Sequence, residues 1–192
     1  MPKTRMKMFV PTHIAHKHDW SPVDRIWSMR DSKHDSVDQD AFTSLIKETS
    51  DCMELLDVIG LSLRKHKRVI EWKPYHSCIA IHHLAQFEAT DRSIYGNRYL
   101  WDLLEECALS VAVLKPRFIA QTMWSLEKLG LTTNPTVQRR AKLCLMKCAD
   151  SLSTNPLLHR LEIWNVADCL HVMARNKQFN HPLIAKVRFT VF

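Results

Sequence analysis

The sequence predicts an all-α protein, built as a short α-solenoid of helix-turn-helix repeats that follows an extended, basic N-terminal tail. Three observations predict this fold. From residue 38 onward, apolar residues recur at the three- and four-residue spacing of amphipathic helices. The chain of 192 residues contains only three glycines, too few for a turn-rich β fold. Similar helical segments also recur at regular intervals, and units of about 40 to 47 residues made of helix pairs are typical of α-solenoids.

Residues 1–38 differ from the rest of the chain. Basic residues and histidines precede the first acid, Asp19, and prolines interrupt any helical pattern. We expect this segment to be an extended anchor that other molecules hold in place, with Trp20 and Trp27 as stacking surfaces. The residues assigned to RNA contact in this tail are Lys3, Arg5, Lys7 and Lys17.

Residues 39–71 predict two leading helices. The apolar side chains of the first are Phe42, Leu45 and Ile46. We expect Ser50 to cap the second helix. The residues expected on its inward face are Met53, Leu56, Ile59 and Leu63. A basic cluster at 64–68 follows the second helix, and cations at this place stabilise the C-terminus of a helix.

Residues 72–192 predict the repeat array, in units of about 72–114, 115–158 and 159–192. We expect a helix that begins at Pro74. The residues on its inward face are Cys78, Ile81, Leu84 and Phe87. The later helices are expected at about 93–112, 116–129, 135–151, 160–175 and 182–192. Each of three prolines fits a helix first turn, and one glycine fits a C-cap: Pro116, Pro135, Pro182 and Gly130.

The repeat is indicated by similar segments that are separated by 47 and by 42 residues in the sequence. Residues 120–126 align with residues 167–173 at an offset of 47, which also superposes Pro135 on Pro182. An offset of 42 places Ile81 on Met123. The alternative is a helical bundle without repeats, since amphipathic helices align easily.

The string from Met123 to Gly130, Met-Trp-Ser-Leu-Glu-Lys-Leu-Gly, resembles the first-helix motif of octotricopeptide-type repeats and of the related FAST-kinase-like and RAP-domain proteins. The resemblance covers about residues 72–192 and is specific in one unit, because the equivalent unit at 171–177 lacks the Trp and the Gly. It implies an organellar helical-repeat protein that binds or processes RNA, or that is built into a mitochondrial ribosome. No RAP domain is visible at the C-terminus.

The formal charge of +7 indicates an anionic partner. From residue 115 to residue 149 there are seven Lys and Arg residues against the single acid Glu127. A row of cations neutralises phosphates and releases their counterions, so it suits RNA; the alternative is a plain solvated face. The residues assigned to RNA contact in this part of the chain are Lys115, Arg117, Arg139, Arg140, Lys142 and Lys147.

The sequence argues against catalysis and against cofactors. The glycine-rich loops that cradle phosphates are missing, and no nucleophile motif such as GxSxG is present. We expect no site at three further groups of residues: the histidines His13, His16 and His18 as metal ligands, the helical pair Cys144 and Cys148 as half of a metal site, and the carboxylates Glu105 and Glu106 as a catalytic pair. We expect no catalytic residue, metal, cofactor or small-molecule substrate. No apolar run is long enough for a membrane span.

The expected function is that of a structural, RNA-associated helical-repeat subunit of an organellar ribonucleoprotein, with the mitochondrial ribosome favoured. Its partners would be rRNA or another structured RNA and neighbouring proteins. Six cysteines without a CxxC pair fit a reducing compartment, and the mitochondrial matrix is expected. Fewer than three units are too few for a base-by-base code, which argues against a sequence-specific reader. The alternatives are a protein scaffold in a respiratory or ATP synthase complex and a free RNA-processing factor.

Overall fold

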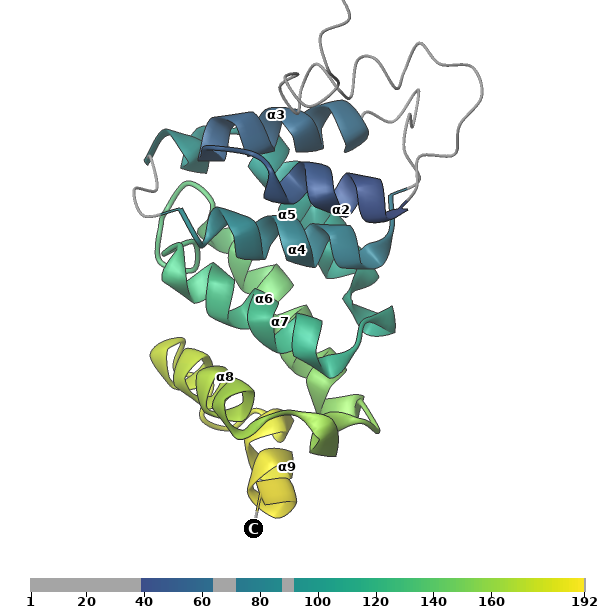
Figure 1. Cartoon of the computed structure of the whole chain (residues 1–192). Coiled ribbons are helices and arrows are strands. Elements are labelled where there is room, and N and C mark those ends of the chain that lie inside the picture. Colours follow the sequence, from purple (N-terminus) through teal and green to yellow (C-terminus); the bar gives the residue numbers. More distant parts are fainter. Residues whose placement is uncertain (1–38, 64–71, 88–91, 192) are drawn as a thin grey trace, which may run out of the picture.

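The computed structural model describes residues 39–63, 72–87 and 92–191 (Figure 1). These residues form α-helices and short 3₁₀ helices, and no strand occurs among them. The all-α prediction is therefore confirmed. The basic tail at 1–38, with its four assigned cations Lys3, Arg5, Lys7 and Lys17, lies outside the described residues, as does the cluster at 64–68.

The observed helices begin and end within a few residues of the expected ones. In chain order they are α2 (Gln39–Lys47), α3 (Cys52–Leu63), α4 (Pro74–Leu84), α5 (Arg98–Ser110), α6 (Pro116–Lys128), α7 (Gln138–Thr154), α8 (Ile163–Arg175) and α9 (Pro182–Val191). Three 3₁₀ helices lie between them: η2 (Arg92–Gly96), η3 (Val111–Val113) and η4 (Leu158–Arg160).

The helices pack in two layers. Helices α2, α4, α6 and α8 contact one another in that order in the first layer, and α3, α5, α7 and α9 do the same in the second. Consecutive pairs α4–α5, α6–α7 and α8–α9 also pack together, and the pairs follow one another down the molecule in Figure 1. Stacked helix pairs are what the repeat predicts; their classification as a solenoid stays a prediction.

The core lies between the layers and along the joins between pairs. Helix α2 buries Phe42, Leu45 and Ile46 completely, as its sequence predicts. Helix α4 likewise buries Cys78, Ile81 and Leu84, whereas Phe87 lies beyond the helix end and is half-buried. The middle of the stack is filled in the same way by α6, through Ile119, Ala120, Met123 and Leu126.

Two expectations about α3 are wrong. Its cap is Asp51, whose carboxylate accepts the backbone N–H groups of Met53 and Glu54, each at 2.8 Å. Ser50 stands one residue too early to reach those amides, and its own N–H and hydroxyl donate to Glu54. Met53 is 40% exposed, because the buried face of α3 is centred on Leu55, Leu56 and Ile59.

A third correction concerns the start of α7. Pro116 and Pro182 open their helices as expected, but Pro135 precedes α7, which begins at Gln138. The backbone carbonyl of Asn134 accepts hydrogen bonds from Val137 and Gln138, and its side chain accepts the N–H of Thr136. This Asn-based turn holds Pro135 outside the helix.

Helices α6 and α8 end in the same way, 47 residues apart in sequence. After α6, Gly130 has a φ of +65°, and Leu131 donates its N–H to the carbonyl of Leu126 at 3.1 Å. After α8, Lys177 has a φ of +57°, and Gln178 donates to Met173 at 2.9 Å. These are Schellman motifs, so the Gly130 prediction is confirmed, and the second unit repeats its geometry without a glycine.

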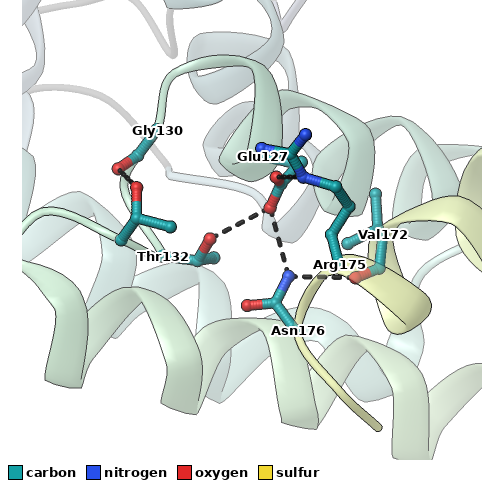
Figure 2. Close-up of polar contacts among 7 residues, drawn as sticks. Glu127, Gly130, Thr132, Val172, Arg175 and Asn176 are labelled. Atoms are coloured by element: carbon teal, nitrogen blue, oxygen red, sulfur yellow. Dashed lines mark hydrogen bonds and ion pairs between the residues drawn. The ribbon is translucent and has the colours of Figure 1, made fainter. Parts of the chain in front are cut away.

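A polar link joins the ends of α6 and α8 (Figure 2). The Glu127 carboxylate accepts hydrogen bonds from the Thr132 hydroxyl at 3.0 Å, the Arg175 guanidinium at 2.9 Å and the Asn176 amide at 3.1 Å. A carboxylate near a helix C-terminus opposes the helix dipole, and three donors offset that cost. The link fixes successive units of the first layer to each other.

Candidate nucleic-acid interface

The cations of α7 lie on its solvent face. Arg139, Lys142 and Lys147 are exposed, as expected. The opposite side of the helix buries Val137, Ala141, Leu145 and Cys148, which the helical period also predicts. The ion pairs among the described residues involve none of the three cations. Their ammonium and guanidinium groups therefore have hydrogen-bond donors left for an anionic partner.

Arg140 has a second role. Its guanidinium lies over the ring of Trp101 on α5, 4.6 Å from the ring centroid. Trp101 is in turn fixed by a hydrogen bond from its indole N–H to the carbonyl of Tyr95 at 2.9 Å. Arg140 thus helps to hold α7 against α5, and its replacement affects packing as well as charge.

Lys115 and Arg117 do not join this row. The Trp101–Arg140 contact places the beginnings of α5 and α7 together, and a hydrogen bond from the Ser151 hydroxyl to the Val111 carbonyl at 3.3 Å places their ends together. Because α6 starts just after Val111, it runs antiparallel to α7. Lys115 and Arg117 are exposed but lie near the end of α7, about 16 Å along the helix from Arg140 at 1.5 Å per residue.

Acidic residues border the row on one side. Helix α5, which packs against α7, carries Asp102, Glu105 and Glu106, with Glu105 exposed. At the far end of α7, Asp150 accepts a hydrogen bond from His181 at 3.1 Å. Phosphates would therefore be attracted along α7 and repelled from the face of α5.

Sequence reasoning missed a second group of polar and aromatic side chains, on α4 and α6. The ring centroids of His82 and Trp124 are 5.7 Å apart. The Lys128 ammonium lies 4.8 Å from the centroid of the Trp124 ring. The imidazole of His82 is hydrogen-bonded to the Ser125 hydroxyl at 3.2 Å and to Gln86 at 3.2 Å. The spacing of Trp124 and Lys128 on α6 is a signal that the sequence offers, but only the packing of α4 against α6 brings His82 to Trp124 and Ser125.

The surroundings of this ring pair are positive. Burial, and then the neighbouring charges of His83, Lys128 and Arg117, lower the pKa of His82. His82 is therefore neutral at physiological pH. The charges of Lys128 and Arg117 near this ring pair produce a locally positive potential, which favours anions.

The cysteines of the described residues are buried free thiols. A hydrogen bond to Cys107, followed by burial, raises the pKa of Cys78, and burial raises that of Cys169 to about 12. Cys78 and Cys169 therefore remain protonated and behave as small apolar groups, whereas hydrogen bonds with Cys107 and Cys148 lower the pKa of the buried Cys144 to about 5. Over the described ranges, no three His, Cys, Asp or Glu side chains are grouped to hold a metal, and no helix is long and apolar enough to cross a membrane.

A comparison of the chain with protein-family models, with curated proteins and with solved structures finds no match.

Proposed function

We propose that this chain is a non-catalytic RNA-binding subunit, which contacts phosphates through the exposed cations of α7. The observation that carries the proposal is that Arg139, Lys142 and Lys147 all lie on the exposed side of α7, around the exposed Leu143, and form no ion pair with the described carboxylates. Neutralising phosphates with such cations releases counterions and gives affinity without sequence preference.

The assembly we favour is an organellar ribonucleoprotein, and specifically the mitochondrial ribosome. A contact that depends on charge alone suits a structural role on rRNA or another structured RNA more than the reading of a sequence. Free buried thiols fit the mitochondrial matrix as a reducing compartment. The resemblance of residues 123–130 to organellar repeat proteins points the same way.

The test reverses the charge of the row while leaving its packing intact. We expect Arg139→Glu, Lys142→Glu and Lys147→Glu together to weaken binding to a structured RNA at physiological salt at least tenfold, with unchanged thermal unfolding, because exposed charges contribute little to stability. Arg140 is left in place because it packs on Trp101.

The matched control changes the net charge by the same amount elsewhere. Lys47, Arg160 and Lys177 are exposed cations outside α7, and their joint replacement by Glu should weaken RNA binding much less. Equal losses for the two triple variants would show that net charge, and not the α7 face, attracts the RNA. Normal binding by the α7 variant would overturn the proposal.

A second candidate function, that of a protein scaffold, is favoured by exposed apolar side chains where the chain enters α8. Ile163 is 67% exposed and Trp164 is 60% exposed. Large exposed apolar groups mark protein contacts when they lie together. If Trp164→Glu abolishes assembly into the native particle while the α7 variant assembles normally, the scaffold function replaces the RNA-binding one.

A further inference from the structure

A cluster of rings and cations lies on the first layer of helices, away from the α7 row. It consists of His82 and His83 on α4 and of Arg117, Trp124 and Lys128 on α6, and we refer to it as the ring cluster. Helices α4 and α6 pack side by side, so the cluster spans the join between two successive units.

The ring pair at the centre of the cluster is fixed by its neighbours. His82 and Trp124 contact each other at 5.7 Å between centroids, and the Ser125 hydroxyl holds the imidazole of His82 at 3.2 Å. Both rings are half-buried, so one part of each is anchored and another part reaches solvent. A flat side chain held in this way loses little entropy when a second ring stacks on it.

The positive charges of the cluster form no ion pair with a carboxylate within the described structure. Arg117 and Lys128 are exposed and take part in none of its ion pairs. The neighbouring acid Glu127 is already occupied by Thr132, Arg175 and Asn176. Burial, and then the nearby positive charges that include Lys128 and Arg117, lower the pKa of His82, so these two cations act on the ring pair.

The same position carries a ring in the next unit. Helix α8 packs on the other side of α6, and its residue 47 positions after Trp124 is His171, which is exposed. Three successive helices of one layer therefore carry His82, Trp124 and His171 at positions that the sequence offsets of 42 and 47 residues superpose.

We propose that the ring cluster binds single-stranded RNA, with a base stacked on Trp124 and phosphates of the strand held by Lys128 on one side of that ring and by Arg117 on the other. This inference rests on the proposed RNA-binding function and adds a second site of different chemistry. Unpaired bases can leave their own stack to meet an aromatic ring, whereas bases in a duplex cannot. The exposed Lys128 ammonium, which lies over Trp124, moves to a phosphate when the base arrives.

The experiment measures binding of the full chain to three fluorescent probes by anisotropy: an oligouridine of about ten nucleotides, within the site size of single-strand binders, an abasic strand of equal length, and a duplex RNA. We expect Trp124→Leu to weaken oligouridine binding about tenfold, since stacking contributes roughly 1 to 3 kcal/mol per base. Binding of the abasic strand should change less than twofold, because that strand keeps the phosphates and lacks the bases.

Two controls make the result specific. Phe179→Leu removes an exposed aromatic side chain outside the cluster and outside α4, α6 and α8, and should leave oligouridine binding unchanged. Trp124→Phe keeps a ring and most of the buried volume and should retain most of the affinity, with the far-UV dichroism and thermal unfolding of the wild type. If Trp124→Phe folds normally and binds as weakly as Trp124→Leu, stacking is not the interaction and the inference is overturned.

The proposal for the ring cluster and the proposal for the α7 cations Arg139, Lys142 and Lys147 can be refuted separately. If the triple α7 variant binds structured RNA like the wild type while Trp124→Leu loses oligouridine, the α7 proposal fails and the ring cluster stands. Equal weakening of the oligouridine and abasic complexes by Trp124→Leu overturns the ring cluster, as does a Phe179→Leu effect of the same size. A Trp124→Leu variant that folds and binds oligouridine with wild-type affinity also overturns it.

Discussion

Lys177 holds a backbone conformation that glycine adopts more easily than lysine. Its φ of +57° matches the +65° of Gly130 at the equivalent place after α6. A side chain costs about 1 to 2 kcal/mol per residue in this region, because Cβ approaches the following carbonyl. The Schellman bonds of Gln178 and Lys177 to the end of α8 keep the conformation in place.

Replacing Lys177 by glycine should therefore stabilise the protein. We expect Lys177→Gly to raise the free energy of unfolding by about 0.5 to 1 kcal/mol, since relief of strain exceeds the extra backbone entropy of glycine in the unfolded chain. Urea denaturation gives the value. The control is Lys142→Gly inside α7, which should lower it by about 1 kcal/mol. Destabilisation by Lys177→Gly would mean that this side chain contributes more than its exposure indicates.

At the scale of the helices, two close contacts determine how neighbouring helices of one layer pack against each other. Gly60 of α3 is buried, and a Cβ placed there would lie 2.5 Å from the Tyr99 ring of α5. The second contact is the Glu127 link between α6 and α8 (Figure 2). The absence of a side chain at Gly60 lets α3 and α5 of the second layer approach each other. The Glu127 link holds α6 and α8 of the first layer together.

Gly60→Ala should destabilise the protein although alanine is the better helix former. The gain in helix propensity is about 1 kcal/mol, whereas overpacking costs typically 1 to 3 kcal/mol. We expect a net loss of about 1 kcal/mol in chemical denaturation. In a Tyr99→Ala background the ring is absent, so the same change should become neutral or stabilising. A loss of equal size in both backgrounds would show that Tyr99 is not the obstacle.

Removing the Glu127 carboxylate should weaken the join between α6 and α8. Glu127→Ala leaves the fully buried Thr132 without its acceptor, and we expect a loss of about 1 to 3 kcal/mol in the free energy of unfolding. Arg175 is 62% exposed, so its share is smaller. Double-mutant cycles should give a larger coupling of Glu127 with Thr132 than with Arg175; the reverse order would mean that the ion pair dominates.

At the scale of the whole molecule, the two layers separate two kinds of surface. The second layer carries the cations of α7 beside the acidic residues of α5, and the first layer carries the ring cluster on α4 and α6. One RNA contact would thus depend on charge alone and the other on stacking as well.

Salt should distinguish these contributions. For structured RNA we expect the affinity of the wild type to fall steeply as salt rises, because bound counterions are released on association. Replacing Arg139, Lys142 and Lys147 by Gln should make the slope of log K against log salt shallower by about 2 to 3, at roughly 0.7 to 0.9 per phosphate contact. Titrations at several salt concentrations measure the slope, and an unchanged slope would exclude these side chains from the contact.

Much of the fold could be predicted from the sequence, because helix formation and burial within a helix are local. The three- and four-residue spacing of apolar residues located the helices and correctly divided α7 into a buried face and a face with Arg139, Lys142 and Lys147. Gly130 was identified as a C-cap because glycine favours left-handed backbone. The same reasoning failed at Ser50 and Pro135, where two residues compete to start a helix and the neighbouring Asp51 and Asn134 bind the free amides.

Contacts between helices were decided by the tertiary structure alone. The antiparallel course of α6 and α7 separates Lys115 and Arg117 from Arg139, although all three belong to one basic stretch of sequence. The meeting of His82 with Trp124 depends on how α4 packs against α6. Helical periodicity states which side of a helix faces inward, but the relative direction and axial position of two helices follow from how their side chains interlock. For this reason the sequence located the cations of α7, and only the packed structure located the ring cluster.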